Sequence, residues 1–504
     1  MNTKIAYDNT VVDEVTAHSG GRSSFYRGVI YTGAGSIAST LFLFLETIIA
    51  VRLLDPASYG VFVLLTVVIS FLDVSIDFGA TTAVTQLIAS SDPQRQNMLA
   101  NSALVFRLVV LLLVSALLWL GHNLFGMIDS SADFLRYATL VPLMLAAYSL
   151  DELLLRTMQG FQAYRHVATG QILRSVLRPL LSLFFLVILG FGMASLIYSW
   201  IISFSVSALY LYIVLPIERR FIWRPQLVQE IVRFGFPIQM NQFLVLISSR
   251  ADVLILGALA TPATVAMFTV GSRIPQALAR LSDSYTAVYF PTMSALLGQG
   301  KRVEAHRMLN NSLRLLSFAS ALVALTTVLF SHEIVTTLFS ETYAASSLVF
   351  SLLMLAFHMD VLINVMGYTL TAAGYPGRSL AESGIRTVVN LVANIVLIPI
   401  FSLVGPALAR LLSYYVSNPV DVWLLRRSNI QVTLGPYVKQ TTLLLLCAIF
   451  YWWAQPVDYV YRAGILGAFV ALNLILMTVS VDDLGYIIPT EAIRRFGLLR
   501  KTEA

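Results

Sequence analysis

The sequence predicts an all-α polytopic membrane protein of about 14 transmembrane helices, in two pseudo-symmetric six-helix lobes followed by two C-terminal helices. Three observations support this prediction. The 504 residues are 57% hydrophobic and only 12% charged, whereas soluble proteins carry about 25% charged residues. Apolar stretches of about 20 residues, long enough to cross a bilayer as helices, recur along the chain. An internal repeat relates the first six stretches to the next six.

The predicted spans follow one another with short connections, so no separate soluble domain is expected. They are 28–52, 59–88, 97–121, 134–155, 166–190, 192–216, 231–258, 263–293, 309–330, 346–373, 380–400, 404–425, 438–454 and 462–481. We therefore divide the chain into a cytoplasmic tail (1–27), an N-lobe (28–222), a C-lobe (223–430) and a last part with two helices and a basic tail (431–504).

The distribution of Lys and Arg predicts that both termini are cytoplasmic. With the amino terminus inside, 22 of the 33 Lys and Arg lie on the cytoplasmic side. Only Arg52, Arg136 and Arg462 lie on the other side. This asymmetry follows the positive-inside rule. The first 27 residues are polar, so no cleaved signal peptide is expected.

Three collinear matches define the repeat. Asp55–Ser58 resembles Thr261–Thr264, Met98–Ser102 resembles Met308–Ser312, and Leu173–Val176 resembles Ile385–Val388. Six spans separate the copies, and six is even, so the lobes have the same orientation. Parallel lobes around a cleft are typical of transporters.

Eight arginines lie inside predicted spans. They are Arg107, Arg174, Arg178, Arg250, Arg273, Arg280, Arg386 and Arg410. A guanidinium facing hydrocarbon costs at least ~2.5–3.5 kcal/mol and cannot readily lose its proton. We therefore expect most of them to line a hydrated basic cavity that binds phosphate oxygens. The alternative is that they pair with intramembrane acids, as Arg280 would with Asp283, and that Arg410 faces a lobe interior.

Helical spacing groups several of these side chains. Arg174 and Arg178 share one helix face with Ser182, and the second copy has Arg386, Asn390 and Asn394 at these positions. Arg273 and Arg280 form another stripe. The substrate-binding candidates are Arg107, Arg174, Arg178, Arg250, Arg273, Arg280, Arg386 and Asn390.

Four intramembrane acids are candidates for ion coupling. Glu46 and Asp252 occupy equivalent places in the two copies, each ten residues before a proline. Such carboxylates can titrate or coordinate Na⁺, but pairing with a neighbouring arginine is an equal alternative. Asp73 and Asp77 share one helix face, so one of them is expected to be protonated, paired or near water. For Asp77, before Phe78-Gly79, a hinge is an equally good interpretation.

No signature of catalysis is present. The six histidines are scattered without metal-ligand spacing, Cys447 is the only cysteine, and no glycine-rich phosphate loop occurs. We expect no enzyme activity, cofactor, metal or nucleic-acid partner. The basic tail from Arg494 to Lys501 predicts contact with anionic membrane lipids.

Several segments together resemble the polysaccharide-unit flippases of the multidrug/oligosaccharidyl-lipid/polysaccharide exporter superfamily. These segments are Arg52–Phe62, Asp77-Phe78-Gly79, Asp252–Gly257, Asn390–Pro399 and Gly405–Ala409. The resemblance covers essentially the whole chain as degenerate patterns.

The resemblance implies a protein of the bacterial cytoplasmic membrane that moves an undecaprenyl-pyrophosphate-linked oligosaccharide outward by alternating access, for exopolysaccharide, capsule or O-antigen synthesis. It implies H⁺ or Na⁺ as a coupling ion, and a polysaccharide polymerase and a chain-length regulator as partners. Two alternatives stay open: a cation-coupled multidrug exporter of the same superfamily, and a polytopic polysaccharide polymerase. The short predicted outer loops, near 121–134 and 330–346, argue against the polymerase.

Overall fold

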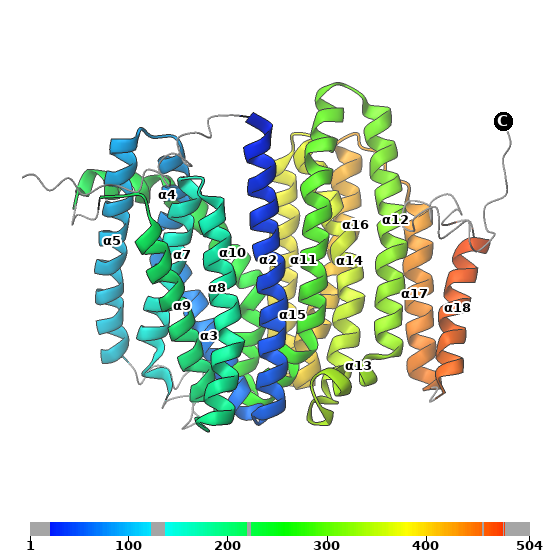
Figure 1. The fold of residues 1–504 in the computed structure, drawn as a ribbon. Coiled ribbons are helices and arrows are strands. Elements are labelled where there is room, and N and C mark those ends of the chain that lie inside the picture. Colours follow the sequence, from blue (N-terminus) through cyan, green and yellow to red (C-terminus); the bar gives the residue numbers. More distant parts are fainter. Residues whose placement is uncertain (1–20, 122–136, 219–222, 456–457, 477, 479–504) are drawn as a thin grey trace, which may run out of the picture. The chain divides into compact units, whose positions relative to one another are not determined.

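The computed structural model describes residues 21–121, 137–218, 223–455, 458–476 and 478, and every regular element within them is helical (Figure 1). The chain divides into two compact units, unit 1 (Met1–Ala266) and unit 2 (Met267–Ala504). The predicted all-α class is confirmed.

Most of the helices have the length of a membrane span. In unit 1 they are α2 (Gly21–Leu53), α3 (Pro56–Asp77), α4 (Ala80–Ala89), α5 (Pro93–Leu120), α7 (Val141–Gly160), α8 (Tyr164–Leu183) with a π-helical end η2 (Phe184–Ile188), α9 (Ala194–Val214) and α10 (Pro225–Leu259). Helix α11 (Pro262–Gly298) begins in unit 1 and lies mostly in unit 2. Unit 2 continues with α12 (Arg302–Leu329), α13 (Ser331–Leu338), η3 (Glu341–Tyr343), α14 (Ser346–Ala372), α15 (Pro376–Phe401), η4 (Ser402–Val404), α16 (Gly405–Arg427), α17 (Leu434–Ala454) and α18 (Tyr459–Ile475).

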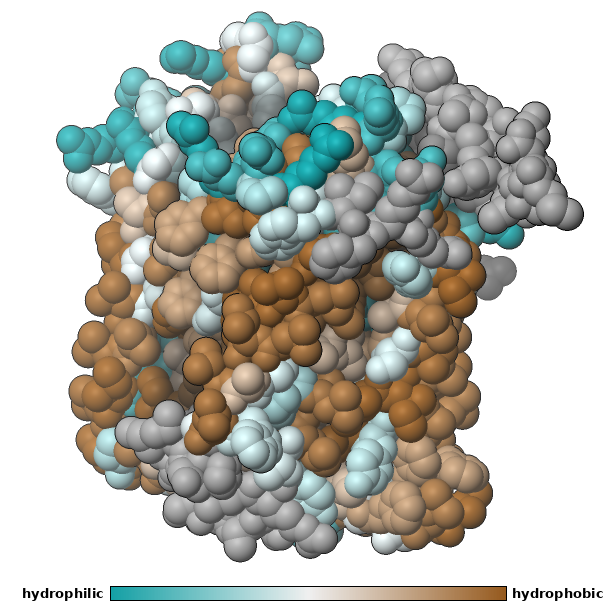
Figure 2. Space-filling view, turned by 90° about the vertical axis from the view of Figure 1, so that its left-hand side faces the viewer, coloured by the Kyte–Doolittle hydropathy of each residue, from teal (hydrophilic) through white to brown (hydrophobic). Residues whose placement is uncertain are grey.

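Each predicted span coincides with a helix, except that 59–88 contains two. Eight stretches of the described residues are long and apolar enough to cross a bilayer, and one of them, Pro376–Arg427, contains both α15 and α16. On the α5 side, Figure 2 shows a broad hydrophobic band with hydrophilic residues gathered at one end. The predicted loop 330–346 is in fact largely helical, as α13 and η3. The loop 121–134 falls almost wholly outside the described residues.

The break within 59–88 has a backbone cause. Phe78 and Gly79 both have left-handed φ angles, of 49° and 77°, which end α3 before α4 begins. Gly79 lies directly against Gly235 of α10, where a Cβ atom would come within 2.1 Å of the Gly235 carbonyl oxygen. Two glycines therefore allow the backbones of two segments to touch. The hinge interpretation of Asp77-Phe78-Gly79 is consistent with this break.

Each unit contains the same packing pattern. In unit 1, α7 packs on α5, α8 and α9, and α8 packs on α9; in unit 2, α14 packs on α12, α15 and α16, and α15 packs on α16. The register is clear in α9 and α16, where buried Ser203 and Ser207 correspond to buried Ser413 and Ser417, 210 residues later. This pattern supports the repeat inferred from the sequence.

Asparagine side chains anchor the segment that follows α9 and the one that follows α16. In unit 1, Asn101 Nδ2 donates to the Glu218 carbonyl (2.9 Å) and Asn97 Oδ1 accepts from the Glu218 amide (3.0 Å). In unit 2, Asn310 makes both bonds by itself: its Nδ2 donates to the Gln431 carbonyl (3.1 Å), and its Oδ1 accepts from the Thr433 amide (2.6 Å). The two halves share this device although the asparagines differ in number.

Candidate functional site

The densest polar cluster of unit 1 surrounds two arginines of α8. Arg174 and Arg178 lie one turn apart, on a helix that packs against α2, α7 and α9. Their side chains are only 19% and 13% exposed. The predicted stripe therefore exists, and it faces neighbouring helices.

Arg174 is joined to α7. Its Nη1 forms an ion pair and hydrogen bond with Oδ2 of Asp151, which is fully buried, and lies 4.0 Å from Glu152 Oε2. The guanidinium also lies 5.3 Å from the ring centroid of Phe204 on α9. An arginine held by carboxylate and ring faces in this way is oriented as well as neutralised.

Arg178 is joined to α2. Its Nη2 lies 2.7 Å from Oε2 of Glu46, and its Nε donates to Oε1 of the same carboxylate at 3.3 Å. Ser182 also donates to Glu46 Oε1, at 3.5 Å. The guanidinium lies 4.6 Å from the Trp200 ring centroid and 5.9 Å from that of Phe204. Glu46, a candidate for ion coupling, is therefore the partner of a candidate for substrate binding.

Three aromatic residues complete this cluster, and we call them the aromatic trio: Tyr148 on α7, and Trp200 and Phe204 on α9. Their ring centroids are 4.8–5.9 Å apart. Trp200 and Phe204 present their rings to the two cations, and Tyr148 packs against both rings.

A second cluster in unit 1 surrounds Arg107 of α5, whose side chain is 1% exposed. Arg107 Nη2 forms an ion pair and hydrogen bond with Asp77, and Nη1 lies 3.8 Å from Asp73. The hydroxyl of Thr81 on α4 donates to Asp77 Oδ2 at 2.9 Å. The two acids predicted to repel on α3 thus lie around a single arginine, which pairs with Asp77 and lies near Asp73.

In unit 2, Arg386 of α15 donates to Glu382 one turn earlier (3.1 Å) and lies 5.6 Å from the Tyr414 ring centroid. Further along α15, the Asn394 amide donates to the carbonyl and to Oδ1 of Asn390 (2.9 and 3.0 Å). Asn390, a predicted ligand, is therefore engaged within its own helix.

A small cavity of about 60 Å³ lies beside this region of unit 2. It is lined by Ser272, Pro275, Gln276, Ala279, Leu353, Ala356, Phe357, Asp360, Arg410 and Tyr414. Arg410 lines this cavity, and its role stays a prediction. The volume suits water molecules and not an oligosaccharide, since ligand sites usually measure about 300–1,000 Å³.

The remaining candidates lie on α10 and α11. Arg250 and Arg273 are half-buried and Arg280 is exposed. Asp252 is buried, and its Oδ1 accepts a hydrogen bond from the Val253 amide (2.8 Å). The side chain of Asp283, the proposed partner of Arg280, lies outside the described residues. The role of these four candidates stays a prediction.

Arg107, Arg174, Arg178 and Arg386 are all paired with carboxylates, which is the alternative that the sequence left open. Sequence reasoning missed three of the acids involved, Asp151, Glu152 and Glu382. Asp151 and Glu152 lie within the predicted span 134–155, and an acid at that depth needs a partner. That signal was available. The aromatic trio has no comparable signal, because aromatic residues are common in any span.

Buried Asp421 on α16 is another acid that was missed. It is 0% exposed, and neither carboxylate oxygen accepts a hydrogen bond from the described residues. Among these residues, no group of three or more His, Cys, Asp or Glu side chains is placed to hold a metal ion.

Helices of this length, with paired charges between them, define a multi-pass membrane protein. The chain belongs to a family described as polysaccharide biosynthesis protein, whose sequence profile matches residues 49–348. It is similar to a probable low-salt glycan biosynthesis flippase, Agl15 of Haloferax volcanii, with 26% identity over 172 residues. That match covers 34% of this chain and 36% of the relative, about a third of each.

Solved structures establish the fold. The chain is similar to the lipid II flippase MurJ in an inward closed conformation, with a TM-score of 0.72 at 11% identity over 90% of this chain and 99% of that one. It is also similar to an inward-facing multidrug resistance MATE family transporter of the MOP superfamily, with a TM-score of 0.64 at 18% identity over 80% and 98%. Both structures share the all-helical, multi-pass membrane fold of this chain.

Proposed function

We propose that this protein moves an undecaprenyl-pyrophosphate-linked oligosaccharide outward across the bacterial cytoplasmic membrane by alternating access, for exopolysaccharide, capsule or O-antigen synthesis. Both termini are cytoplasmic in this proposal. The moving parts are the lobes 28–222 and 223–430, with residues 431–504 as an appendage. A polysaccharide polymerase and a chain-length regulator act on the product.

The observation that carries the proposal is the pair of arginines on α8, each held by one carboxylate. Two adjacent guanidinium groups match the oxygens of a pyrophosphate, which they can bind bidentately. With no substrate bound, Asp151 and Glu46 serve as their counter-ions. A buried guanidinium without any counter-ion would be strongly destabilising. The carboxylates therefore keep the empty site stable.

This arrangement makes substrate binding an exchange of anions. A pyrophosphate can take over Arg174 and Arg178 only if Asp151 and Glu46 give them up. Protonation of a carboxylate removes its charge and releases its arginine. In this proposal H⁺ is therefore the coupling ion at Glu46, while Asp73, Asp77 and Asp252 stay candidates for H⁺ or Na⁺.

The test is to neutralise one pair on both sides. Arg178→Gln and Glu46→Gln are each expected to lower the amount of protein in the membrane, because each leaves one buried charge. The double variant removes both charges and should recover the membrane level. If Arg178 binds substrate, the double variant should still fail to restore surface polysaccharide in a host that lacks its own transporter.

The matched control is Arg95→Gln with Glu230→Gln, an exposed pair at 2.5 Å between α5 and α10. This control should export normally. Normal export by the Glu46→Gln/Arg178→Gln variant would mean that the pair only holds α2 against α8, and the proposed site would be lost.

The multidrug exporter is a second candidate, favoured by the aromatic trio and by the likeness to a multidrug transporter. Aromatic faces bind organic cations. The discriminating measurement is accumulation of a cationic dye in cells with and without the protein. A change in dye efflux without any change in surface polysaccharide would favour this candidate.

A further inference from the structure

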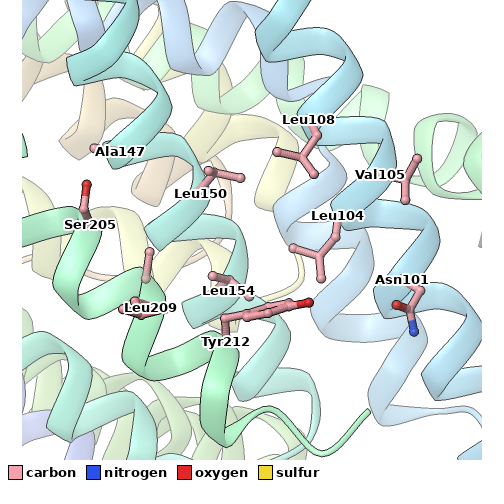
Figure 3. A pocket seen from close by; sticks show the side chains of 11 residues that line it. Asn101, Leu104, Val105, Leu108, Ala147, Leu150, Leu154, Ser205, Leu209 and Tyr212 are labelled. Atoms are coloured by element: carbon pink, nitrogen blue, oxygen red, sulfur yellow. The ribbon is translucent and has the colours of Figure 1, made fainter. Parts of the chain in front are cut away.

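A groove of about 480 Å³ lies in unit 1 between α5, α7 and α9. Leu104 and Leu108 of α5 face Leu150 and Leu154 of α7 across it, and the ring of Tyr212 on α9 reaches beneath them toward α5 (Figure 3). The groove lies apart from the arginine clusters, and the proposed function does not use it.

The lining suits hydrocarbon. Of the described lining residues, only Asn101, Ser205 and Tyr212 bring polar groups, and none is charged. The amide nitrogen of Asn101 already donates to the carbonyls of Asn97 and Glu218 at 2.9 Å. Its volume falls in the range of about 300–1,000 Å³ that is usual for sites of small molecules.

The groove opens toward the face that the bilayer covers. Leu108 is 45% exposed and Leu209 is 58% exposed, and both belong to helices apolar enough to span the membrane. A helix with its side chains is about 10–12 Å across, so a protein helix could lie over the groove but could not enter it. A single flexible chain can enter.

The corresponding face of unit 2 is filled by the protein itself. Phe318, which corresponds to Leu108, stacks on Phe469 of α18 with ring centroids 6.3 Å apart. Leu362 and Met366, which correspond to Leu150 and Leu154, share a core cluster with Tyr437 of α17. His358 of α14 completes the attachment through Thr441 of α17 (2.9 Å).

Among the described residues of unit 1, no helix covers the groove in this way. The helices packed most closely on α5 are α3, α4, α7 and α10, and none of them is a counterpart of α17 or α18. An unfilled crevice loses dispersion contacts on every side. The material available at this depth in a membrane is hydrocarbon.

We propose that the groove between α5, α7 and α9 is a binding site for one acyl chain of a bilayer phospholipid. The acyl chain covers this face of unit 1, as the aromatic side chains of α17 and α18 cover the corresponding face of unit 2. It lies against Leu104, Leu108, Leu150 and Leu154, with Tyr212 below it.

The test uses the purified full-length protein in vesicles of phosphatidylethanolamine and phosphatidylglycerol that contain a trace of phospholipid with a diazirine in one acyl chain. After illumination, mass spectrometry of peptides locates the adducts. We expect adducts on the groove-lining residues to exceed those on the outer face of α5, at Leu112 and Leu117, by about tenfold. Equal labelling of both faces would overturn the proposal.

Ala208→Phe fills the groove and should reduce its adducts by about tenfold. Ala116→Phe adds the same bulk on the exposed face of α5 and should leave them unchanged. If Ala208→Phe does not fold, Ser205→Leu fills part of the same space and should give a smaller loss. Undiminished groove adducts in a folded filling variant would contradict the proposal.

Displacement of the adducts by an excess of polyprenyl phosphate would identify a carrier lipid as the occupant and would also overturn the proposal. These readouts measure lipid binding and not export, so they are independent of the proposed function.

Discussion

Arg174 of unit 1 lies against Phe204, with Trp200 and Tyr148 beside it, whereas Arg386 of unit 2 lies against Tyr414. The repeat places Asp360 and Arg410 of unit 2 where unit 1 has Tyr148 and Trp200. One half thus surrounds its arginine with rings, and the other surrounds it with further charges.

The acid partners differ as well. In unit 1 they come from other helices, Glu46 from α2 and Asp151 from α7, so each pair also links two helices. In unit 2 Glu382 comes from the same helix as Arg386, and buried Asp421 stands where unit 1 has Leu211. The two halves therefore share the arginine (Arg174 and Arg386) and the helix packing around it, but they differ in the number and origin of the acids beside it. The two arginines on α8 of unit 1 each have an acid partner, whereas the corresponding region of unit 2 has Asp421 in addition to the acid that pairs with Arg386.

The largest effect is expected at Arg107, because its unit 2 counterpart is Ser317 and not a cation. Arg107→Ser would make the halves alike, but it leaves Asp73 and Asp77 buried without their counter-ion. We expect a loss of about 3–5 kcal/mol of unfolding free energy, measured by denaturation in detergent. Adding Asp73→Asn and Asp77→Asn should restore much of it. A stable Arg107→Ser single variant would contradict this account.

The next comparison is between Asp151→Asn and Asp421→Asn. Asp151→Asn removes the partner of Arg174, which is partly exposed, and should cost about 2 kcal/mol. Asp421→Asn removes a buried carboxyl group that accepts no hydrogen bond from the described residues, and should leave stability unchanged or raise it by about 1 kcal/mol. Both can be measured as thermal unfolding of the purified protein. Equal losses would mean that Asp421 is as well compensated as Asp151.

The asparagine anchors should differ by a smaller amount. Asn310→Ala loses bonds to both Gln431 and Thr433 and should cost about 2 kcal/mol at most, since each hydrogen bond contributes about 1 kcal/mol. Asn97→Ala loses one of the two bonds to Glu218 and should cost about 1 kcal/mol. Limited proteolysis after α9 and after α16 would report the same difference locally. A larger effect at Asn97 would reverse the comparison.

The smallest effect concerns the turns before α3 and α11. Asp55 Oδ1 accepts from the Ser58 amide (3.0 Å), and at the equivalent place Thr261 Oγ1 accepts from the Thr264 amide (3.3 Å). Replacing either by Ala should cost about 1 kcal/mol or less. Thermal unfolding across a pH series would measure both.

Only the Asp55 cap should depend on pH. Burial acts to raise the pKa of Asp55, but hydrogen bonds from Ser58 and neighbouring amides outweigh it, so the pKa is below its ordinary value. A lowered pKa means that the stabilisation is complete at neutral pH and is lost as the pH falls through the pKa of the folded state. An equal pH dependence in Thr261→Ala would contradict this assignment.

The sequence predicted the helices well because a span needs about 20 apolar residues and a helix satisfies its own backbone. The continuous span 59–88 missed the break at Phe78 because the apolar pattern runs through it, although a hinge at Asp77-Phe78-Gly79 was one of the two interpretations, and the contact with Gly235 could not be read from the sequence. Nor did the sequence predict which acid each arginine meets. Spacing placed Arg174 and Arg178 on one face, but the partners Asp151 and Glu46 come from helices whose rotation depends on packing. Glu382 was missed as well, although a partner one turn away from Arg386 can be read from spacing alone.

The contact between Gly79 and Gly235 has a consequence for how α10 can move. Pro237, two residues further along α10, has no amide hydrogen, so the helix lacks one rung of its hydrogen-bond ladder next to the point of contact. Bending therefore costs least there. The part of α10 before Gly235 can bend about its backbone contact with Gly79, while the part after it stays packed on α3. A side chain at either glycine would push the two backbones apart and remove this point of contact.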